Sequence, residues 1–118
     1  MSPPLPAPVS AYIAATNAFE IDAFMATFAG GALVNDHCNE FPGLTAIRSW
    51  AQREIIDDRV TMEVSAATVR GAAIAVTAII TGNFDRTGLP DPLLLTFYFT
   101  IGNGLIDQLI IVHNKPTA

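Results

Sequence analysis

The second half of the chain constrains the fold most, because it consists of long apolar runs separated by turn residues. Four runs have the length and the β-branched composition of strands: 60–69, 72–81, 93–101 and 105–113. Asn103 and Gly104, which both tolerate positive φ, predict a type I′ turn between the last two runs. Residues 82–92 contain glycine and proline and are expected to form a loop. We therefore expect an antiparallel meander of long strands.

The N-terminal stretch is rich in proline and precedes a helical pattern. Residues 1–8 hold four of the eight prolines, so we expect an extended, mobile lead-in. Pro8 suits the first turn of a helix, because the N–H that proline lacks would have no partner there. From Val9 to Phe19, apolar residues recur every three or four positions, which predicts an amphipathic helix. We expect one folded domain over 9–118.

Two further helices are expected before the strands begin. Asp22 is a suitable N-cap for a short helix that runs through Phe28. Gly30 and Gly31 are expected to end that helix, because glycine readily adopts the left-handed conformation of a helix end. Thr45 is expected to cap a third helix over 46–56. Helices followed by an antiparallel meander predict an α+β fold, with the helices on one face of a curved sheet.

One predicted strand is apolar on both faces. Residues 72–80 contain no charged side chain, whereas a sheet with one solvated face would show alternation. The outer face of this strand therefore needs a cover. A second copy of the same sheet, related by a two-fold axis, would provide one, so we expect a homodimer through the sheet.

Charge and composition exclude several classes of protein. The net charge is −5, and the six Lys and Arg residues form no cluster that could neutralise nucleic-acid phosphates or an anionic membrane surface. No window of about 18 residues is free of polar positions, as a spanning helix would require. The N-terminus has no signal-peptide pattern, and the single cysteine, Cys38, cannot form an intrachain disulfide. A reduced, cytoplasmic setting is the expectation.

Asp36 is the leading candidate for a functional residue. It ends a short apolar strand expected over 32–36, in a chain of which only 14% is charged. A carboxylate in an apolar cavity is a competent general base, because desolvation disfavours its charged form. The alternative is that Asp36 caps or braces the loop that leads to Gly43.

The order and spacing of several motifs resemble the nuclear transport factor 2-like superfamily, in particular its SnoaL-like and ketosteroid-isomerase-like branch. The motifs that carry the resemblance are Tyr12, the run 24–28, the run 32–36, Gly43, the run 46–50 and the final hairpin over 99–106. The resemblance implies a cone in which a curved antiparallel sheet wraps around about three N-terminal helices. It also implies a dimer and an apolar pocket for a small ligand at the wide end.

The resemblance also assigns site residues. The general base of the ketosteroid isomerases corresponds to Asp36, and their oxyanion-binding tyrosine corresponds to Tyr12, 24 residues earlier. Trp50 takes the place of a pocket aromatic, and His113 lies at the pocket mouth. We expect the remaining pocket wall to comprise Phe28, Phe97, Phe99, Leu109 and Ile111.

The chain departs from the isomerases at one position. Their second oxyanion donor, a protonated aspartic acid, would fall on Thr96 or Phe97, and neither is an acid. Half of that oxyanion hole is therefore missing. Tyr12 could still donate to an oxyanion, or it could be a core aromatic. His113 alternates in phase with Leu109 and Ile111, so it could face the pocket as an acid or base, or be partly exposed at a strand end.

The residues that follow Asp36 offer no convincing metal site or nucleophile. Consecutive side chains of a strand point to opposite faces, so Asp36 and His37 are expected to diverge. The spacing matches no zinc pattern. Cys38 is expected to be a small, semi-buried residue rather than a nucleophile.

Two hypotheses remain open at this point. The first is a small cofactor-free enzyme that acts by general acid/base catalysis on an apolar carbonyl- or hydroxyl-bearing molecule, as an isomerase, cyclase, dehydratase or hydrolase. The second is a non-catalytic dimeric module that binds a small molecule or a partner on the same fold. The fold alone cannot choose between them.

Overall fold

A computed structural model describes residues 5–85 and 87–113. The helices are α1 (Ala7–Ala18), α2 (Ile21–Met25) and α3 (Gly43–Ala51), which a π-helical turn, η1 (Gln52–Ile56), extends. The strands are β1 (Phe28–Asp36), β2 (Asn39–Pro42), β3 (Thr61–Arg70), β4 (Ala73–Thr81), β5 (Leu93–Gly102) and β6 (Leu105–His113). This order confirms the α+β prediction.

The six strands form one mixed sheet in the order β2-β1-β6-β5-β4-β3. The meander from β3 to β6 is antiparallel, as predicted, and Asn103 and Gly104 both have positive φ at its last turn. The β1–β2 pair is also antiparallel, whereas β1 runs parallel to β6. The parallel pair arises because β6, the last strand of the meander, pairs with β1 at the edge of the β1–β2 hairpin.

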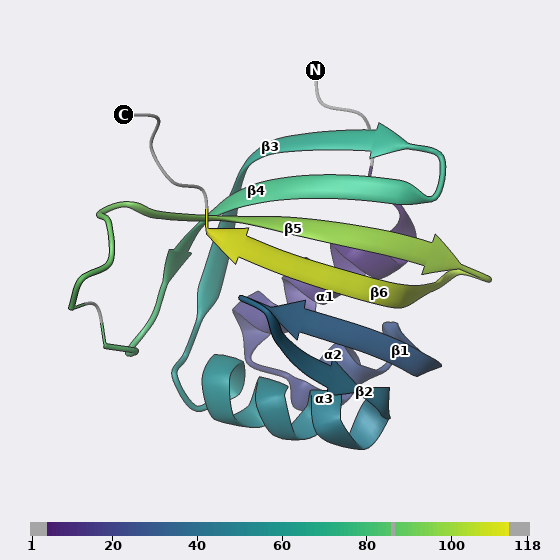
Figure 1. Cartoon of the computed structure of the whole chain (residues 1–118), viewed down its shortest axis with the longest axis horizontal. Helices are drawn as coiled ribbons and strands as arrows, with labels where there is room; N and C mark the ends of the chain where they lie inside the picture. Colours follow the sequence, from purple (N-terminus) through teal and green to yellow (C-terminus); the bar gives the residue numbers. More distant parts are fainter. Residues whose placement is uncertain (1–4, 86, 114–118) are drawn as a thin grey trace.

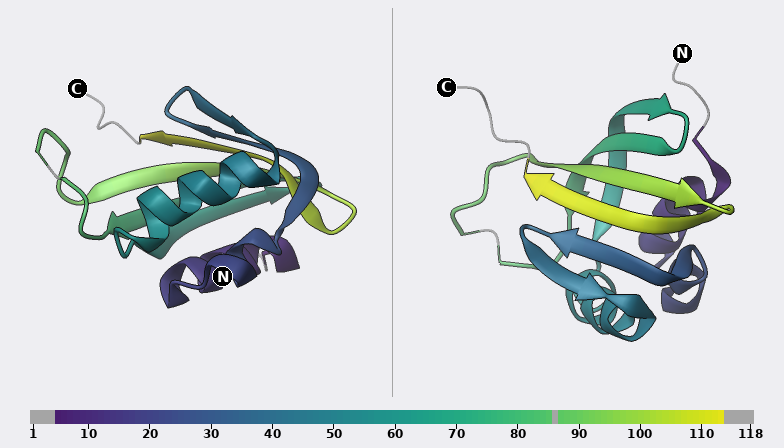
Figure 2. Two further views of the ribbon diagram at one scale, coloured as in Figure 1. Left: turned by 90° about the horizontal axis from the view of Figure 1, so that it is seen from below. Right: turned by 45° about the vertical axis from the view of Figure 1, so that its right-hand side comes forward.

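The sheet is strongly bent, and the helices lie against its inner face (Figures 1 and 2). The core between the two layers is apolar and dominated by aromatic residues from both layers, including Tyr12, Phe24, Trp50, Phe97 and Phe99. Within the described part of the chain, no helix has both the length and the apolar composition needed to cross a membrane.

The first helix begins earlier than the sequence predicts. Ala7 and Pro8 already lie in α1, with Pro8 in the first turn as expected, and Leu5 packs against the core. The lead-in therefore does not extend to residue 8, because the apolar core anchors the chain from residue 5 onward. Residues 1–4 lie outside the described residues.

The prediction that two glycines end the second helix is wrong. α2 ends at Met25, and Phe28 is already the first residue of β1. Gly30 and Gly31 lie inside β1 with no positive φ, where the pairing with β6 shifts register. Glycine in a strand often marks such an irregularity, because it has no side chain to restrict the bend. Asp22 lies inside the first turn of α2 rather than at its N-cap.

The loop expected after Asp36 is in fact a hairpin. β2 pairs with β1 from Asp36↔Asn39 to Leu33↔Pro42, so only His37 and Cys38 form the turn. The third helix begins at Gly43, directly after this hairpin, and Thr45 makes no capping hydrogen bond. The sequence contains no typical signal for this hairpin, because neither turn residue is glycine or asparagine.

Candidate active site

A cavity of about 240 Å³ opens between the inner face of the sheet and the helices. It lies at the end of the sheet where β1 and β6 finish, since Asp36 and His113, the last residues of these strands, both line it. Phe84 and Leu89 of the β4–β5 loop also contribute to its wall. The predicted residues Tyr12, Asp36, Trp50 and His113 are therefore brought together around one cavity.

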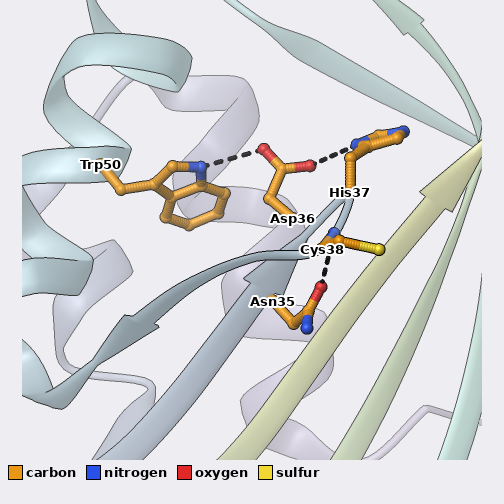
Figure 3. Close-up of polar contacts among 5 residues, drawn as sticks. All are labelled: Asn35, Asp36, His37, Cys38 and Trp50. Carbon is orange, nitrogen blue, oxygen red and sulfur yellow. Dashed lines mark hydrogen bonds and ion pairs between the residues drawn. The ribbon is translucent and has the colours of Figure 1, made fainter.

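The Asp36 carboxylate is held by two donors from different elements (Figure 3). The indole Nε1–H of Trp50 on α3 donates to Asp36 Oδ2 at 3.1 Å, and Nδ1 of His37 lies 2.7 Å from Asp36 Oδ1. The Asp36 side chain is 24% exposed. These two contacts fix the orientation of the carboxylate at the cavity wall and leave it lone pairs for a further proton.

The contact between Asp36 and His37 corrects the expectation that these side chains diverge. Strand alternation does not reach His37, because this residue has φ of 52° and lies in the turn. Its backbone N–H donates to the carbonyl of Ile111 at 3.2 Å, which ties the turn to β6. The His37 ring contacts the His113 ring, with the centroids 3.7 Å apart. Sequence reasoning missed His37 as a site residue.

Tyr12 connects the core with the cavity. Its ring packs against four phenylalanine rings of the core, those of Phe24, Phe28, Phe97 and Phe99. The side chain is 1% exposed, and its hydroxyl has no hydrogen-bond partner among the described residues. Every side-chain oxygen of the described residues that is fully shielded from solvent has a hydrogen-bond partner. The unpaired Tyr12 hydroxyl is therefore not fully shielded, and we infer that it faces the cavity that Tyr12 lines. Burial, and secondarily the charge of Asp36, raise the pKa of the Tyr12 phenol far above its ordinary value.

The predicted ligand-binding residues divide into two groups. Trp50, Phe97 and Ile111 line the cavity. Phe28, Phe99 and Leu109 are buried in the core and are not part of the cavity wall. Leu109 is in phase with Ile111 on β6, but it is fully buried and lies two residues farther from the end of the strand at His113.

Comparisons with known proteins give a consistent result. A candidate polyketide cyclase from Sinorhizobium meliloti is 32% identical, with a TM-score of 0.82 over 92% of this chain and 95% of that one. A ketosteroid-isomerase-like protein from Catenulispora acidiphila, in complex with trimethylamine, has 21% identity and a TM-score of 0.76 over 92% and 86% of the two chains. No protein-family model and no curated protein sequence matches the chain.

A third structure extends these comparisons to an isomerase. The Δ5-3-ketosteroid isomerase of a Mycobacterium species is 16% identical, with a TM-score of 0.73 over 92% of this chain and 91% of the isomerase. The chain belongs to the nuclear transport factor 2-like superfamily, in its SnoaL-like and ketosteroid-isomerase-like branch. The resemblance seen in the sequence motifs is thereby confirmed.

In this SnoaL-like chain, neither residue expected at the position of the second oxyanion donor, Thr96 or Phe97, is an acid. Phe97 points into the cavity, whereas Thr96 lies on the opposite face of β5, where its hydroxyl lies 3.1 Å from that of Thr77. Tyr12 is therefore the only phenol that lines the cavity among the described residues.

Several polar residues of the cavity wall were not predicted. Thr16, Glu54 and Asp58 line the cavity, although the Thr16 hydroxyl already donates to the carbonyl of Tyr12 at 2.8 Å. Glu54 lies in η1, and its side chain is half exposed. The available signal was its spacing, because Trp50, Glu54 and Asp58 follow one another at intervals of four residues and so share a helical face.

Cys38 does not contribute to the site. The residue is exposed, not semi-buried as expected, because it forms the tip of the β1–β2 turn with φ of 69°. Its backbone N–H donates to Asn35 Oδ1 at 2.9 Å, so it has a structural place in the turn. Among the described residues, no three His, Cys, Asp or Glu side chains are grouped so that they could hold a metal ion.

Proposed function

We propose that this protein is a small enzyme that performs general acid/base catalysis on a small apolar, carbonyl- or hydroxyl-bearing molecule bound in the cavity. One observation carries the proposal: the Asp36 carboxylate is fixed by Trp50 and His37 at the wall of a largely apolar cavity. A positioned carboxylate in such a place is suited to remove a proton from a bound substrate.

Tyr12 supports this proposal as a hydrogen-bond donor. The phenol is protonated at neutral pH, and burial raises its pKa further, so that the hydroxyl can donate to a developing oxyanion. Asp36 would take the proton from a carbon next to a carbonyl group, and the phenol would stabilise the enolate oxygen. His37 and His113, whose rings touch at the cavity wall, are placed to exchange a proton with solvent.

The reaction favoured is proton abstraction next to a carbonyl, the step that isomerisation and aldol-type cyclisation have in common. The cavity volume of about 240 Å³ is below the ~300 Å³ at which pockets for drug-sized ligands begin. A substrate with one or two rings would fit this volume better than a steroid. Catalysis with Tyr12 alone also requires a more acidic substrate carbon than an isomerase with two oxyanion donors does.

Deuterium exchange tests the proposed function without knowledge of the natural substrate. The protein is mixed in D2O with β-tetralone, a bicyclic ketone with an acidic α-carbon, and the loss of the α-proton signal is followed by NMR. We expect the native protein to accelerate exchange and the Asp36→Asn variant to lose about a hundredfold or more of that acceleration. Glu63→Gln, which removes an exposed carboxylate from β3, is the matched control and should retain the native rate.

The outcome of this assay decides between the two hypotheses. Exchange at an equal rate in native protein and the Asp36→Asn variant would remove Asp36 from the mechanism. No acceleration by native protein, with β-tetralone bound, would favour the non-catalytic binding module.

We also propose that two copies associate through the outer faces of their sheets. Along the middle of β4, β5 and β6 the outward side chains are uncharged: Ala75, Thr77, Ile79, Leu94, Thr96, Tyr98, Ile110 and Val112. Tyr98 is 48% and Val112 37% exposed in the single chain. Such a surface favours a self-complementary interface. Light scattering at micromolar concentration should give the mass of a dimer, and a monomer mass would contradict this proposal.

A further inference from the structure

Apart from the imidazoles of His37 and His113, the charged residues of the cavity wall all carry the same sign. Three carboxylates line the cavity, those of Asp36, Glu54 and Asp58, and the described lining residues include no Lys or Arg. Glu54 Oε2 lies 3.7 Å from an Arg53 guanidinium nitrogen, but both side chains are at least half exposed, so solvent screens this pair. The cavity wall thus carries an excess of negative charge.

The charges are distributed over two sides of the cavity. Asp36 ends β1 and is occupied by Trp50 and His37. Glu54 belongs to η1, and Asp58 to the turn that follows it, so both lie on the helical side. A ligand could therefore contact Asp36 with one end and the pair Glu54 and Asp58 with the other.

A second, independent feature points to a ligand in this place. The Tyr12 side chain is 1% exposed, and its hydroxyl has no partner among the described residues and faces the cavity. Aromatic rings of Tyr12, Trp50, Phe84 and Phe97 line the same space. Faces of aromatic rings attract cations, and Trp does so most strongly. Carboxylates combined with aromatic rings form a wall that suits a small organic cation better than a neutral molecule.

We propose that the natural ligand of the cavity carries a protonated amine, which Glu54 and Asp58 recognise while its apolar part lies among the aromatic rings. This inference rests on the proposed function only in taking the cavity as the ligand site. Combined with the proposed proton abstraction, it gives the substrate class as a small amine-bearing carbonyl compound of one or two rings.

Three probes of similar size and different charge test this proposal: benzylamine, benzyl alcohol and benzoate. Binding is measured at about pH 8, where an alkyl amine is protonated and an ordinary imidazole is neutral. Trp50 is the single tryptophan and lines the cavity, so its fluorescence reports binding directly. We expect benzylamine to bind about tenfold more tightly than benzyl alcohol, and benzoate to bind most weakly.

The Glu54→Gln/Asp58→Asn double variant should reduce this tenfold preference to about twofold, because it keeps the shape of the wall and removes two charges. Glu63→Gln, which removes one exposed carboxylate outside the cavity wall, should retain the native preference. Absence of a preference for benzylamine, whether all probes bind alike or none does, would overturn the proposal. An undiminished preference in the double variant would overturn it as well. The fluorescence assay measures binding and needs no catalytic turnover. The result therefore does not depend on whether Asp36 acts as a base.

Discussion

The β1–β2 and β5–β6 hairpins turn in the same way with very different residues. Both turns have two residues, and all four residues have positive φ: 52° and 69° at His37 and Cys38, 53° and 77° at Asn103 and Gly104. Asn-Gly adopts this conformation at little cost. His and Cys adopt it only against a steric penalty of about 1–2 kcal/mol each. The residue types of the Asn-Gly turn thus suit its backbone conformation, whereas those of the His-Cys turn do not.

The two turns lie at opposite ends of the sheet, because β6 begins at the Asn103–Gly104 turn and ends beside the His37–Cys38 turn. Among the described residues, none at the end near Asn103 and Gly104 belongs to the cavity wall. The end at His37 and Cys38 borders the cavity, and its turn conformation brings His37 to 2.7 Å from Asp36. Backbone strain that the surrounding structure holds in place is a known feature of functional sites. This comparison is the basis of our hypothesis that the β1–β2 turn is strained because it positions His37 beside Asp36.

Transferring the strained pair to the other turn gives the largest expected effect on stability. The Asn103→His/Gly104→Cys double variant should lose about 2 kcal/mol of unfolding free energy, because two left-handed positions lose their tolerant residues. Urea denaturation followed by Trp50 fluorescence measures this loss. The deuterium-exchange rate should remain native, since the cavity is at the other end. Equal stability of variant and native protein would show that His-Cys carries no strain in this conformation.

A second prediction concerns Tyr12 at the cavity end. Above about pH 10 an unfolded tyrosine releases a proton, whereas the raised pKa of Tyr12 keeps the folded state protonated. The unfolded state then binds fewer protons than the folded state, so stability falls as pH rises. This contribution is intact below about pH 10. Native protein should lose about 1.4 kcal/mol more than Tyr12→Phe between about pH 9 and pH 11. Parallel urea titrations check this, and equal losses would place the phenol in a solvated environment.

The smallest expected effect separates the two residues of the strained turn. Cys38 is exposed and contributes only its backbone to the turn, so Cys38→Gly should relieve strain and raise the unfolding free energy by about 0.5–1 kcal/mol. The exchange rate should not change. A variant that is less stable than native protein, or slower in exchange, would assign a role to the thiol.

The turn at Asn103 and Gly104 could be predicted from sequence because local propensity and final structure agree there. The same agreement holds for the long strands and the first helix. The family resemblance also predicted that one site contains Tyr12, Asp36, Trp50 and His113. These four residues do line one cavity.

His37 could not be predicted in the same way, because its residue type disfavours the conformation that it adopts. The alternation rule gave the wrong direction for its side chain, because β1 ends at Asp36 and His37 already lies in the turn. Gly30 and Gly31 were misassigned for the opposite reason. Their permissiveness fits a helix end as well as a bent strand, and tertiary pairing with β6 decides between the two.

The central claim is that His37 is held in a strained turn in order to position Asp36. The most direct test is the deuterium-exchange rate of His37→Gly, with Cys38→Gly as the matched control for relief of strain at the neighbouring residue. Glycine keeps the turn but removes the imidazole that lies 2.7 Å from the Asp36 carboxylate. We predict a loss of about tenfold to a hundredfold in the exchange rate of His37→Gly, against a native rate in Cys38→Gly. A native rate in both variants would contradict the claim.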